Sequence, residues 1–359
     1  MYITSLDLQN FRNYERQSVS LNQGVNIFYG KNAQGKTNLL EAVYLAGTTK
    51  SHKGSKDREM IRKGEEESHI RMDVVRDTIS HRIDLHLKKN KPKGIAIDRI
   101  PVKKAADLFR IIHLVFFSPE DLGIIKNGPA ARRRFLNFEL CQIDKIYLAV
   151  LGEYSKCLMQ RNKLLKELEP GSPRLAELDI WDEQLVRFGT EVIRRRASFL
   201  DSMNEVIRDI HFELSGGKEE IFLKYDPSTA AESFAVDLTM ARDRDLLYKE
   251  THVGPHRDDI AIMINEMDSR VYSSQGQQRS AALSLKLSEI RMIRKATGDT
   301  PVLLLDDVMS ELDSERQKQL LSEIRGIQTL ITCTGLDDFV QNNFEADSVF
   351  RVENGRIVS

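Results

Sequence analysis

The sequence has few cysteines, few aromatic residues and no long hydrophobic run. Its three cysteines form no CxxC pair and cannot build a zinc site by themselves; they are Cys141, Cys157 and Cys333. The longest apolar runs, such as residues 111–117, are far too short to cross a bilayer. Residues 1–15 alternate polar and apolar side chains and carry charge, which is not the pattern of a signal peptide. We therefore expect a cytoplasmic protein without a membrane partner.

The chain of 359 residues is 41% hydrophobic, which excludes global disorder and allows one large domain or two ordinary ones. Its net charge of −1 argues against a uniformly basic nucleic-acid binder. The charge is uneven, however. Residues 49–104 hold 16 Lys and Arg against 9 Asp and Glu, a balance of +7, so the rest of the chain sums to −8. One basic and one acidic region are therefore expected, the acidic one around residues 301–323.

Strand patterns occupy both ends of the chain. Alternating or short apolar runs predict strands at 2–9, 18–21, 24–29, 70–75, 80–87, 111–117, 220–224, 259–264, 302–305, 329–332, 348–352 and 356–358. Helices are predicted at 36–46, 277–295 and 314–324. This distribution predicts an α/β domain assembled from the two ends of the chain.

The middle of the chain has a different pattern. Apolar residues from Leu136 to Cys157 recur at alternating intervals of four and three, which predicts one helix with a narrow apolar stripe. A second stripe runs from Leu178 to Ile210 after the break at Pro170–Pro173. Two such helices joined by a tight break predict an antiparallel hairpin, with Arg194–Arg196 off the stripe. We assign residues 1–118 and 249–359 to a head and 119–248 to this helical arm.

A phosphate-binding pattern follows the strand predicted at 24–29. Residues 30–37 read GKNAQGKT, which fits GxxxxGK[ST] between a buried strand and a helix. Glycines let the backbone curl its N–H groups towards an anion, and the helix N-terminus adds positive dipole. Lys36 would reach the β and γ phosphates, and the Thr37 hydroxyl would bind Mg²⁺. The alternative, a glycine turn arising by chance, does not explain the flanking strand and helix.

Two carboxylates end another buried strand. Residues 302–307 read VLLLDD. Asp306 would hold Mg²⁺, and Asp307 would position or deprotonate the attacking water. Alone, such a run equally describes an ordinary strand end, but together with the phosphate loop it indicates an NTPase. Lys36 and Asp306 lie 270 positions apart, further than a small GTPase needs, and the base-recognition NKxD is missing because Asn162-Lys163 is followed by two leucines.

Two further segments flank the Asp306 strand. Residues 273–278 read SSQGQQ and open the preceding helix, where the simplest role is an N-cap. They also resemble the S-G-G-Q signature of ABC-type ATPases, with Gln275 in the first glycine place. Such a signature completes the site of a neighbouring subunit through a serine hydroxyl and a helix N-terminus. Residues 310–313, SELD, resemble the D-loop of the same ATPases.

Within the ABC-type ATPases the chain resembles the RecF family over its whole length. The resemblance rests on LQNFRNY at 8–14, GKNAQGKTNLLEA at 30–42, FSPEDL at 117–122 with RRRFL at 132–136, and THVGPHRDD at 251–259. It implies an SMC-like P-loop ATPase head built from both chain ends, with an inserted antiparallel helical arm. It also implies a weak DNA-stimulated ATPase of recombinational gap repair and replication restart. Such a protein dimerises around two ATP molecules and helps load recombinase with RecO and RecR.

The same resemblance assigns the site residues. ATP would contact one subunit through Gly30, Lys31, Asn32, Ala33, Gln34, Gly35, Lys36, Thr37, Arg12 and Asn13, and the other through Ser274, Gly276 and Gln277. Mg²⁺ would bind Thr37 and Asp306, and catalysis would use Asp307, Lys36 and Ser274. For Arg12 the alternative is an ordinary surface arginine. Asp307 stands where most ABC ATPases have glutamate, which fits slow hydrolysis, and residues 332–334 offer no switch histidine.

Double-stranded DNA, or a junction of single and double strands, is the expected macromolecular ligand. Residues 49–63 carry a net charge of +4 and contact-capable side chains at Lys50, Lys53, Lys56, Arg58, Arg62 and Lys63. Aromatic residues are only 7% and are not interleaved with the basic runs, which argues against a base-stacking single-strand platform. Arg132–Arg134 and Arg194–Arg196 have two interpretations, DNA contacts or the charged faces of arm helices.

Three alternatives remain at this point. His252 and His256 in the THVGPHRDD segment suit a structural turn better than a catalytic site. A transporter-type ATP subunit would have a switch histidine and no helical arm. A purely structural SMC-like clamp would not need Lys36, Asp306 and Asp307, although slow turnover would resemble it.

Overall fold

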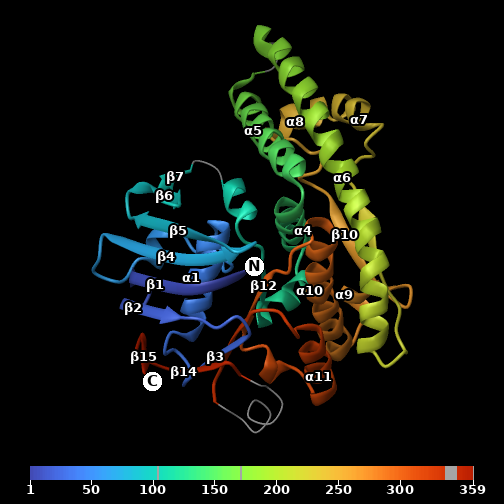
Figure 1. The fold of residues 1–359 in the computed structure, drawn as a ribbon. Helices are drawn as coiled ribbons and strands as arrows, with labels where there is room; N and C mark the ends of the chain where they lie inside the picture. The colour runs from blue at the N-terminus through green and yellow to red at the C-terminus, as the bar shows by residue number, and fades with distance from the viewer. Residues whose placement is uncertain (103–104, 170–171, 336–345, 359) are drawn as a thin grey trace. The chain divides into compact units, whose positions relative to one another are not determined.

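A computed structural model describes residues 1–102, 105–169, 172–335 and 346–358. The chain divides into two compact units (Figure 1). The first contains Met1–Asp121 and Glu289–Ser359, and the second contains Leu122–Ser288. In the described part of the chain no helix is both long and apolar enough to cross a membrane. The break predicted at Pro170–Pro173 includes two residues, 170 and 171, that lie outside the described ranges.

The first unit contains a six-stranded antiparallel sheet in the order β2-β1-β4-β5-β6-β7. Its strands are β1 (Tyr2–Phe11), β2 (Tyr14–Ser20), β4 (Glu67–Arg76), β5 (Ile79–Lys88), β6 (Lys91–Ile97) and β7 (Ile100–Pro101). β4 alternates strictly between buried and exposed residues from Glu67 to Met72, as expected of a sheet with one face against a core and one towards water. β6 and β7 were not predicted, because β6 begins with Lys-Pro-Lys-Gly and β7 is only two residues long.

A second sheet joins the two ends of the chain in the order β15-β14-β3-β13-β12-β8. Its strands are β3 (Val25–Tyr29), β8 (Leu114–Phe117), β12 (Val302–Asp306), β13 (Thr329–Cys333), β14 (Ser348–Glu353) and β15 (Arg356–Val358). All pairs are parallel except β14 with β15. β8, β12 and β13 are buried at every position, which is typical of parallel strands covered on both faces. The α/β domain predicted from both chain ends is confirmed.

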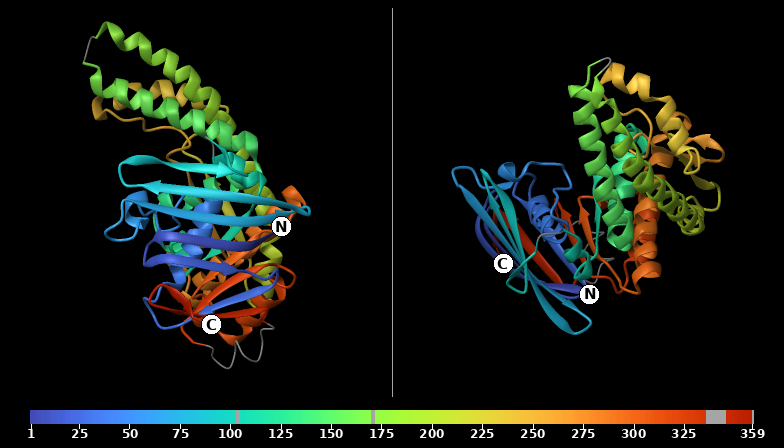
Figure 2. Two further views of the ribbon diagram at one scale, coloured as in Figure 1. Left: turned by 60° about the vertical axis from the view of Figure 1, so that its left-hand side comes forward. Right: turned by 90° about the horizontal axis from the view of Figure 1, so that it is seen from above.

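Helix α1 (Lys36–Thr48) packs between these two sheets, contacting β1, β4 and β5 on one side and β8, β12 and β13 on the other (Figure 2). All but two of its residues are buried. A helix that is buried on all sides needs apolar or small residues around its whole circumference, and LLEAVYLAGT supplies them apart from Glu41. The remaining elements of this unit are short: α2 (Asp57–Met60), η1 (Ala105–Arg110), η2 (Pro119–Asp121), η4 (Met309–Glu311) and α11 (Ser314–Glu323).

The second unit is mainly helical. Its helices are α3 (Leu122–Lys126), α4 (Pro129–Ile143), α5 (Lys145–Glu167), η3 (Pro173–Ala176), α6 (Glu177–Leu214), α7 (Phe234–Met240), α8 (Arg242–Tyr248), α9 (Ser269–Tyr272) and α10 (Gln275–Thr297), which continues into the first unit. α5 and α6 pack along each other as the predicted antiparallel pair (Figure 2). Leu178, Leu185, Val192, Phe199 and Met203 of the second stripe are buried.

The first predicted arm helix is two helices. The backbone leaves the helical region at Asp144, whose φ is −124° and ψ 101°. Its carboxylate accepts hydrogen bonds from the backbone N–H groups of Ile146 and Tyr147, both at 2.9 Å. An aspartate in this place is a strong N-cap and starts a new helix. The stripe from Leu136 to Cys157 continues across the break, and for this reason periodicity alone could not locate it.

A three-stranded antiparallel sheet, β11-β10-β9, completes the second unit. It contains β9 (Ile221–Asp226), β10 (Asp259–Ile264) and β11 (Met267–Asp268). The sequence-based division placed residues 249–288 with the head, whereas the compact units place them with the helices. The reason is that β10 pairs with β9 over its whole length. The functional division into a head and an arm stays a prediction.

Three arginines expected on exposed faces of the arm have other roles. Arg132 and Arg196 are buried, and Arg133 donates a hydrogen bond to a backbone carbonyl. The Arg132 guanidinium pairs with Asp259 at 2.7 Å, and Arg133 donates to the Asp258 carbonyl. Arg196 is 1% exposed. It donates to the Asp258 carboxylate at 2.8 Å and the Pro255 carbonyl at 2.6 Å. The interpretation that placed Arg196 off the apolar stripe is therefore wrong, and its charge serves the fold. Arg194, two positions earlier, has a half-exposed side chain and one 3.6 Å contact, to Glu232.

We predict that Arg196→Ala lowers the free energy of unfolding by about 3–5 kcal/mol, because it leaves the buried Asp258 carboxylate without its counter-charge. The matched change Arg194→Ala on the same helix should cost less than about 0.5 kcal/mol, since its ion pair is exposed. Urea unfolding followed by circular dichroism measures both. Similar destabilisation in the two variants would contradict the assignment of Arg196 to the core.

Candidate nucleotide-binding site

The loop at residues 30–37 connects the C-terminal end of β3 to the N-terminus of α1. The carboxyl ends of parallel strands meet at one edge of a sheet, where open α/β folds bind their ligands. β12 and β13 end at this same edge, at Asp306 and Cys333. No side chain caps the α1 N-terminus, and its first turn has no acidic residue. The backbone N–H groups there suit an anion.

Gly35 shows why the loop requires glycine. Its φ is 115°, in the left-handed half of the conformational map. An added Cβ would lie 2.6 Å from the Asn13 amide nitrogen. Any other residue there would strain the backbone and collide with the β1–β2 turn.

The Lys36 side chain folds back over the loop. Its ammonium group donates to the carbonyls of Gly30 at 2.5 Å and Lys31 at 3.0 Å, and the residue is 7% exposed. These contacts keep the positive charge above the loop backbone, where phosphate oxygens would compete for the same donors. Lys36 therefore lies where the sequence pattern placed it.

The Asp306 carboxylate connects its own strand to two segments that are distant in sequence. Its Oδ1 accepts hydrogen bonds from the Thr37 hydroxyl at 2.8 Å and from the Thr332 hydroxyl at 2.7 Å. Thr37 is the second residue of α1, which follows β3 and the loop, and Thr332 lies on β13, between β3 and β12. The structure brings Thr37 and Asp306 together as predicted from the sequence. It also adds Thr332, which the sequence indicated only as a place where a histidine was missing.

Asp307 follows Asp306 in a left-handed conformation with φ of 53°. Aspartate tolerates this region better than most residues, and such conformations concentrate at functional sites. Its backbone N–H donates to the Thr332 hydroxyl at 3.0 Å and the Thr332 carbonyl at 3.2 Å. The same threonine thus fixes the direction of Asp306 and the backbone of Asp307.

The β1–β2 turn supports the loop from the side. Asn13 donates to the Gln34 carbonyl at 2.9 Å, and the Tyr14 hydroxyl donates to the Gly35 carbonyl at 3.1 Å. Arg12 has a left-handed φ of 53° and donates two hydrogen bonds, at 2.7 and 2.8 Å, to the carboxylate of Glu41. Glu41 is 1% exposed. The sequence predicted Arg12 as a nucleotide contact but not its pairing with Glu41, whose only signal was an acidic residue within an otherwise apolar helix.

The signature-like segment at residues 273–278 caps α10. Ser274 donates its backbone N–H to the Gln277 side chain at 2.8 Å, and its hydroxyl accepts from the Gln277 backbone N–H at 3.3 Å. This reciprocal pair is a capping box. Ser274 is nevertheless exposed. The expected N-cap is confirmed, and the segment also presents a serine hydroxyl beside the N-terminus of a 23-residue helix.

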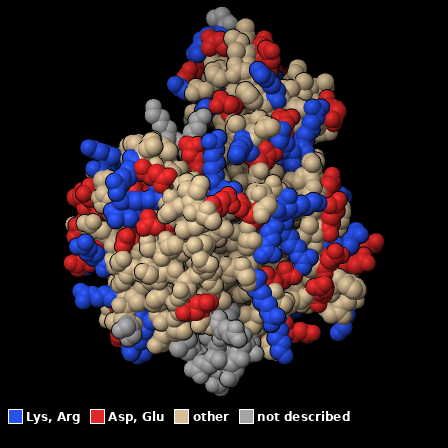
Figure 3. Space-filling model, viewed as in Figure 1, with Lys and Arg blue, Asp and Glu red and all other residues tan. Residues whose placement is uncertain are grey.

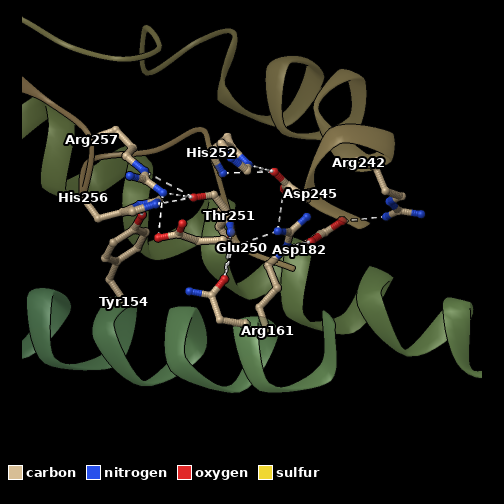
Figure 4. Close-up of polar contacts among 11 residues, drawn as sticks. Tyr154, Arg161, Asp182, Arg242, Asp245, Glu250, Thr251, His252, His256 and Arg257 are labelled. Carbon is tan, nitrogen blue, oxygen red and sulfur yellow. Dashed lines mark hydrogen bonds and ion pairs between the residues drawn. The ribbon is translucent and has the colours of Figure 1, made fainter. Parts of the chain in front are cut away.

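The THVGPHRDD segment forms a polar junction within the second unit (Figure 4). His256 hydrogen-bonds to the Tyr154 hydroxyl at 2.6 Å and to the Thr251 carbonyl at 2.9 Å. His252 pairs with Asp245 at 2.9 Å, and Asp245 in turn accepts from the fully buried Arg161 at 2.7 Å. Burial is the main cause that lowers the pKa of His256 to about 4, so this ring is neutral at pH 7. These contacts fit the structural interpretation of both histidines.

Known proteins similar to this chain identify its family. The family model for the RecF/RecN/SMC N-terminal domain matches residues 2–357. The DNA replication and repair protein RecF of Agathobacter rectalis is 56% identical over 357 residues, or 99% of each chain. The chain belongs to the RecF family. A solved RecF structure, titled as the recombination mediator protein with ATP in the RecFOR pathway, aligns with a TM-score of 0.93 at 38% identity, covering 99% of this chain and 97% of that one. The Smc head of Pyrococcus furiosus, 16% identical with a TM-score of 0.57, shares the fold.

Membership in the RecF family confirms the P-loop ABC-type head built from both chain ends, with the inserted helical arm. The individual site residues stay predictions, as does the role of the basic segment at residues 49–63.

That basic segment surrounds α2 in the first unit. Arg62 pairs with Glu15 at 3.2 Å, and Lys53 lies 3.9 Å from Glu120. The remaining four side chains are exposed and make no ion pair with the described residues; they are Lys50, Lys56, Arg58 and Lys63. On the visible face, Lys and Arg lie beside Asp and Glu over most of the charged area, with one group of Lys and Arg to the right of the centre (Figure 3).

The Arg12–Glu41 pair predicts a pH effect on stability. Burial raises the pKa of Glu41, but the hydrogen bonds and charge of Arg12, with a hydrogen bond from Ser51, outweigh it and lower this pKa below its ordinary value of 4.5. A lowered carboxyl pKa contributes stability that is present above the ordinary value and lost as pH falls through the folded-state value. Glu41→Gln should cost about 1–3 kcal/mol at pH 7. Its difference from the wild type should shrink as pH falls below 4.5.

Urea unfolding at pH 7 and pH 4 tests this expectation. Glu65→Gln is the control, because Glu65 is only partly buried and accepts one hydrogen bond, from Asn10 at 3.2 Å. Its effect should be small at both pH values. A Glu41→Gln difference that does not change with pH would rule out the buried ion pair.

Proposed function

We propose that this chain is an ATP-dependent DNA-binding protein of recombinational gap repair and replication restart in the cytoplasm. ATP binding drives dimerisation and clamping on DNA, and slow hydrolysis releases the clamp, which helps load recombinase with RecO and RecR. The observation that carries the proposal is the meeting of the 30–37 loop, Thr37 and Asp306 at one sheet edge. A solved RecF relative described with ATP in the RecFOR pathway supports it.

The loop residues fit a nucleotide triphosphate. In the proposed complex the backbone N–H groups of residues 30–37 surround the phosphates, and the Lys36 ammonium moves from the Gly30 and Lys31 carbonyls to phosphate oxygens. The Thr37 hydroxyl and the Asp306 carboxylate, 2.8 Å apart, are hard oxygen donors of the kind that Mg²⁺ prefers. When bound there, Mg²⁺ would neutralise phosphate charge.

Asp307 is the proposed base. Its carboxylate orients a water molecule towards the γ-phosphate and takes up the proton of that water during attack. The Thr332 hydroxyl and carbonyl hold the backbone of Asp307 in its left-handed conformation. An aspartate reaches one methylene less far than the glutamate of most ABC ATPases. This shorter reach is consistent with slow turnover, in which ATP hydrolysis sets how long the clamped state lasts.

The second half of each site comes from the partner chain in this proposal. Ser274 and Gly276, with Gln277, stand at the N-terminus of α10, where the helix dipole favours an anion. The exposed Ser274 hydroxyl is available to a γ-phosphate, while its backbone remains in the capping box with Gln277. Two ATP molecules would thus lie between two chains, and ATP binding would shift the equilibrium towards the closed dimer.

The basic segment at residues 49–63 is the proposed DNA surface. Four of its six cations carry exposed charges without an ion pair among the described residues. Elsewhere among the described residues of 49–104, most Lys and Arg side chains are paired, as in Lys89 with Glu66 and Lys93 with Asp57. Unpaired surface cations bind phosphates without reading sequence, and the binding depends on salt. Double-stranded DNA or a gap junction is therefore the proposed ligand.

We predict that three variants separate the steps of the cycle. Lys36→Arg should abolish ATP-driven dimerisation because the longer, planar guanidinium does not fit the loop. Ser274→Arg should block dimerisation by placing a large side chain at the interface, while monomer ATP binding is kept. Asp307→Asn should trap the ATP-bound dimer because an amide cannot take up a proton. Analytical ultracentrifugation with and without ATP measures the dimer, and equilibrium dialysis measures ATP binding.

The control for the serine variant is Ser155→Arg, which makes the same change at an exposed position on α5. It should dimerise like the wild type. Because Ser274 also caps α10, circular dichroism must first establish that the Ser274→Arg chain is folded. Normal dimerisation of folded Lys36→Arg and Ser274→Arg chains would refute the mechanism, and unaltered turnover in Asp307→Asn would remove its role as base.

We further predict that Lys56→Ala, Arg58→Ala and Lys63→Ala combined weaken duplex DNA binding and flatten its salt dependence. The slope of log K against log[salt] should fall by about 0.9 for each phosphate that the variant no longer neutralises. The charge-matched control combines Lys145→Ala, Lys163→Ala and Lys166→Ala on the exposed side of α5. Fluorescence anisotropy on single-stranded, duplex and gapped DNA measures both, with and without ATP. Equal changes in the two triple variants would contradict a localised DNA surface.

A further inference from the structure

The exposed face of the antiparallel sheet carries two imidazoles and a carboxylate at adjacent positions. Glu67 and His69 lie two residues apart on β4, so their side chains project from the same face. His86 on β5 is the direct cross-strand partner of His69. Side chains opposite each other on neighbouring strands lie about 5 Å apart at Cβ. The backbone register alone therefore brings these three side chains together.

Their donor atoms converge on one point above the sheet. Nε2 of His86 lies 3.0 Å from one Glu67 carboxylate oxygen, and Nε2 of His69 lies 3.9 Å from the other. The two imidazole rings stack with centroids 3.8 Å apart. One ligand atom from each of the three residues lies within 4.8 Å of those from the other two. Small side-chain rotations would place all three at coordination distance from a single ion.

The three side chains are of the kinds that bind transition metals. An unprotonated imidazole nitrogen and an ionised carboxylate are ligating groups. Two imidazoles with one carboxylate form a donor set used for zinc, with further coordination positions left open.

We propose that Glu67, His69 and His86 form a surface site for a divalent late transition metal, of which Zn²⁺ suits the donors best. The opposite neighbour of His86 on β6 is Gly94, so no side chain covers the site from that strand. The open coordination position therefore faces solvent. The site lies on the antiparallel sheet, whereas the proposed nucleotide site lies at an edge of the other sheet, and neither proposal depends on the other.

The ammonium group of Lys88 would compete with a metal ion for the Glu67 carboxylate. This ammonium lies 3.4 Å from that carboxylate, because Lys88 is the cross-strand partner of Glu67. A bound metal must displace this ammonium from the carboxylate and experiences its repulsion. Removing the charge of Lys88 should therefore tighten metal binding, whereas in a purely structural salt-bridge cluster the same change would create no affinity for metal.

The test is titration of the nucleotide-free full-length chain with Zn²⁺ by calorimetry, in excess Mg²⁺, and with Co²⁺ followed by visible absorption. We expect one Zn²⁺ per chain at this site and a tetrahedral-type Co²⁺ spectrum that Zn²⁺ abolishes. His69→Ala, His86→Ala and Glu67→Gln should each weaken binding by more than about tenfold, since even the loss of an outer-shell partner typically costs that much. Lys88→Gln should bind more tightly than the wild type.

His81→Ala is the matched control. His81 also lies on β5 and also contacts a carboxylate, Asp98 at 2.9 Å, but its cross-strand partner on β4 is Val74 rather than a histidine. Its zinc affinity should equal that of the wild type. The proposal is overturned if the wild type binds no more tightly than the His69→Ala/His86→Ala double variant. It is equally overturned if His81→Ala loses as much affinity. Unchanged affinity in Glu67→Gln would exclude Glu67 as a ligand.

Discussion

The hydrogen bonds of the Asp306 carboxylate connect the strands of the first unit to its candidate nucleotide site. Asp306 is 5% exposed and accepts hydroxyl hydrogen bonds from Thr37 and Thr332. Those two residues come from opposite ends of the chain, and β13 can present Thr332 only because it lies between β3 and β12. A buried carboxylate without these donors would be costly. The order of the strands β3, β13 and β12 is therefore needed to satisfy the hydrogen bonds of the buried Asp306 carboxylate.

The sequence predicted well those features that follow from short-range patterns. Buried apolar strands such as Val302–Asp306 and the loop at 30–37 carry signals within a few residues, and both are found where expected. The break at Asp144 was missed because the apolar stripe continues across it while the cap acts on only two N–H groups. Arg196 was misplaced for a related reason. A charged residue off the stripe is normally exposed. The burial of Arg196 depends instead on partners that are distant in sequence, among them Asp258, 62 positions away.

Within the candidate site the same distinction holds. Lys36 and Thr37 were predictable because one motif fixes both, and Asp306 followed from a strand that ends in carboxylates. Thr332 and Glu41 were not predictable, since each acts on a residue far from it in sequence: Thr332 on Asp306, and Glu41 on Arg12. Supporting contacts of this kind depend on tertiary packing and leave almost no local pattern. The net charge of −1 hid the basic segment for a similar reason, because it sums paired and unpaired charges.

The β1–β2 turn connects the loop to the basic segment. Asn13 holds the Gln34 carbonyl of the loop, while the neighbouring Arg12 donates to the Ser55 hydroxyl and the Glu59 carbonyl, both in the segment 49–63. Glu41 of α1 joins the same network through Arg12 and Ser51. Because α1 is packed between two sheets, it cannot absorb a displacement at its N-terminus by bending into solvent. These contacts place one continuous hydrogen-bond network between the loop and the segment 49–63, which the proposed nucleotide-controlled DNA surface would require.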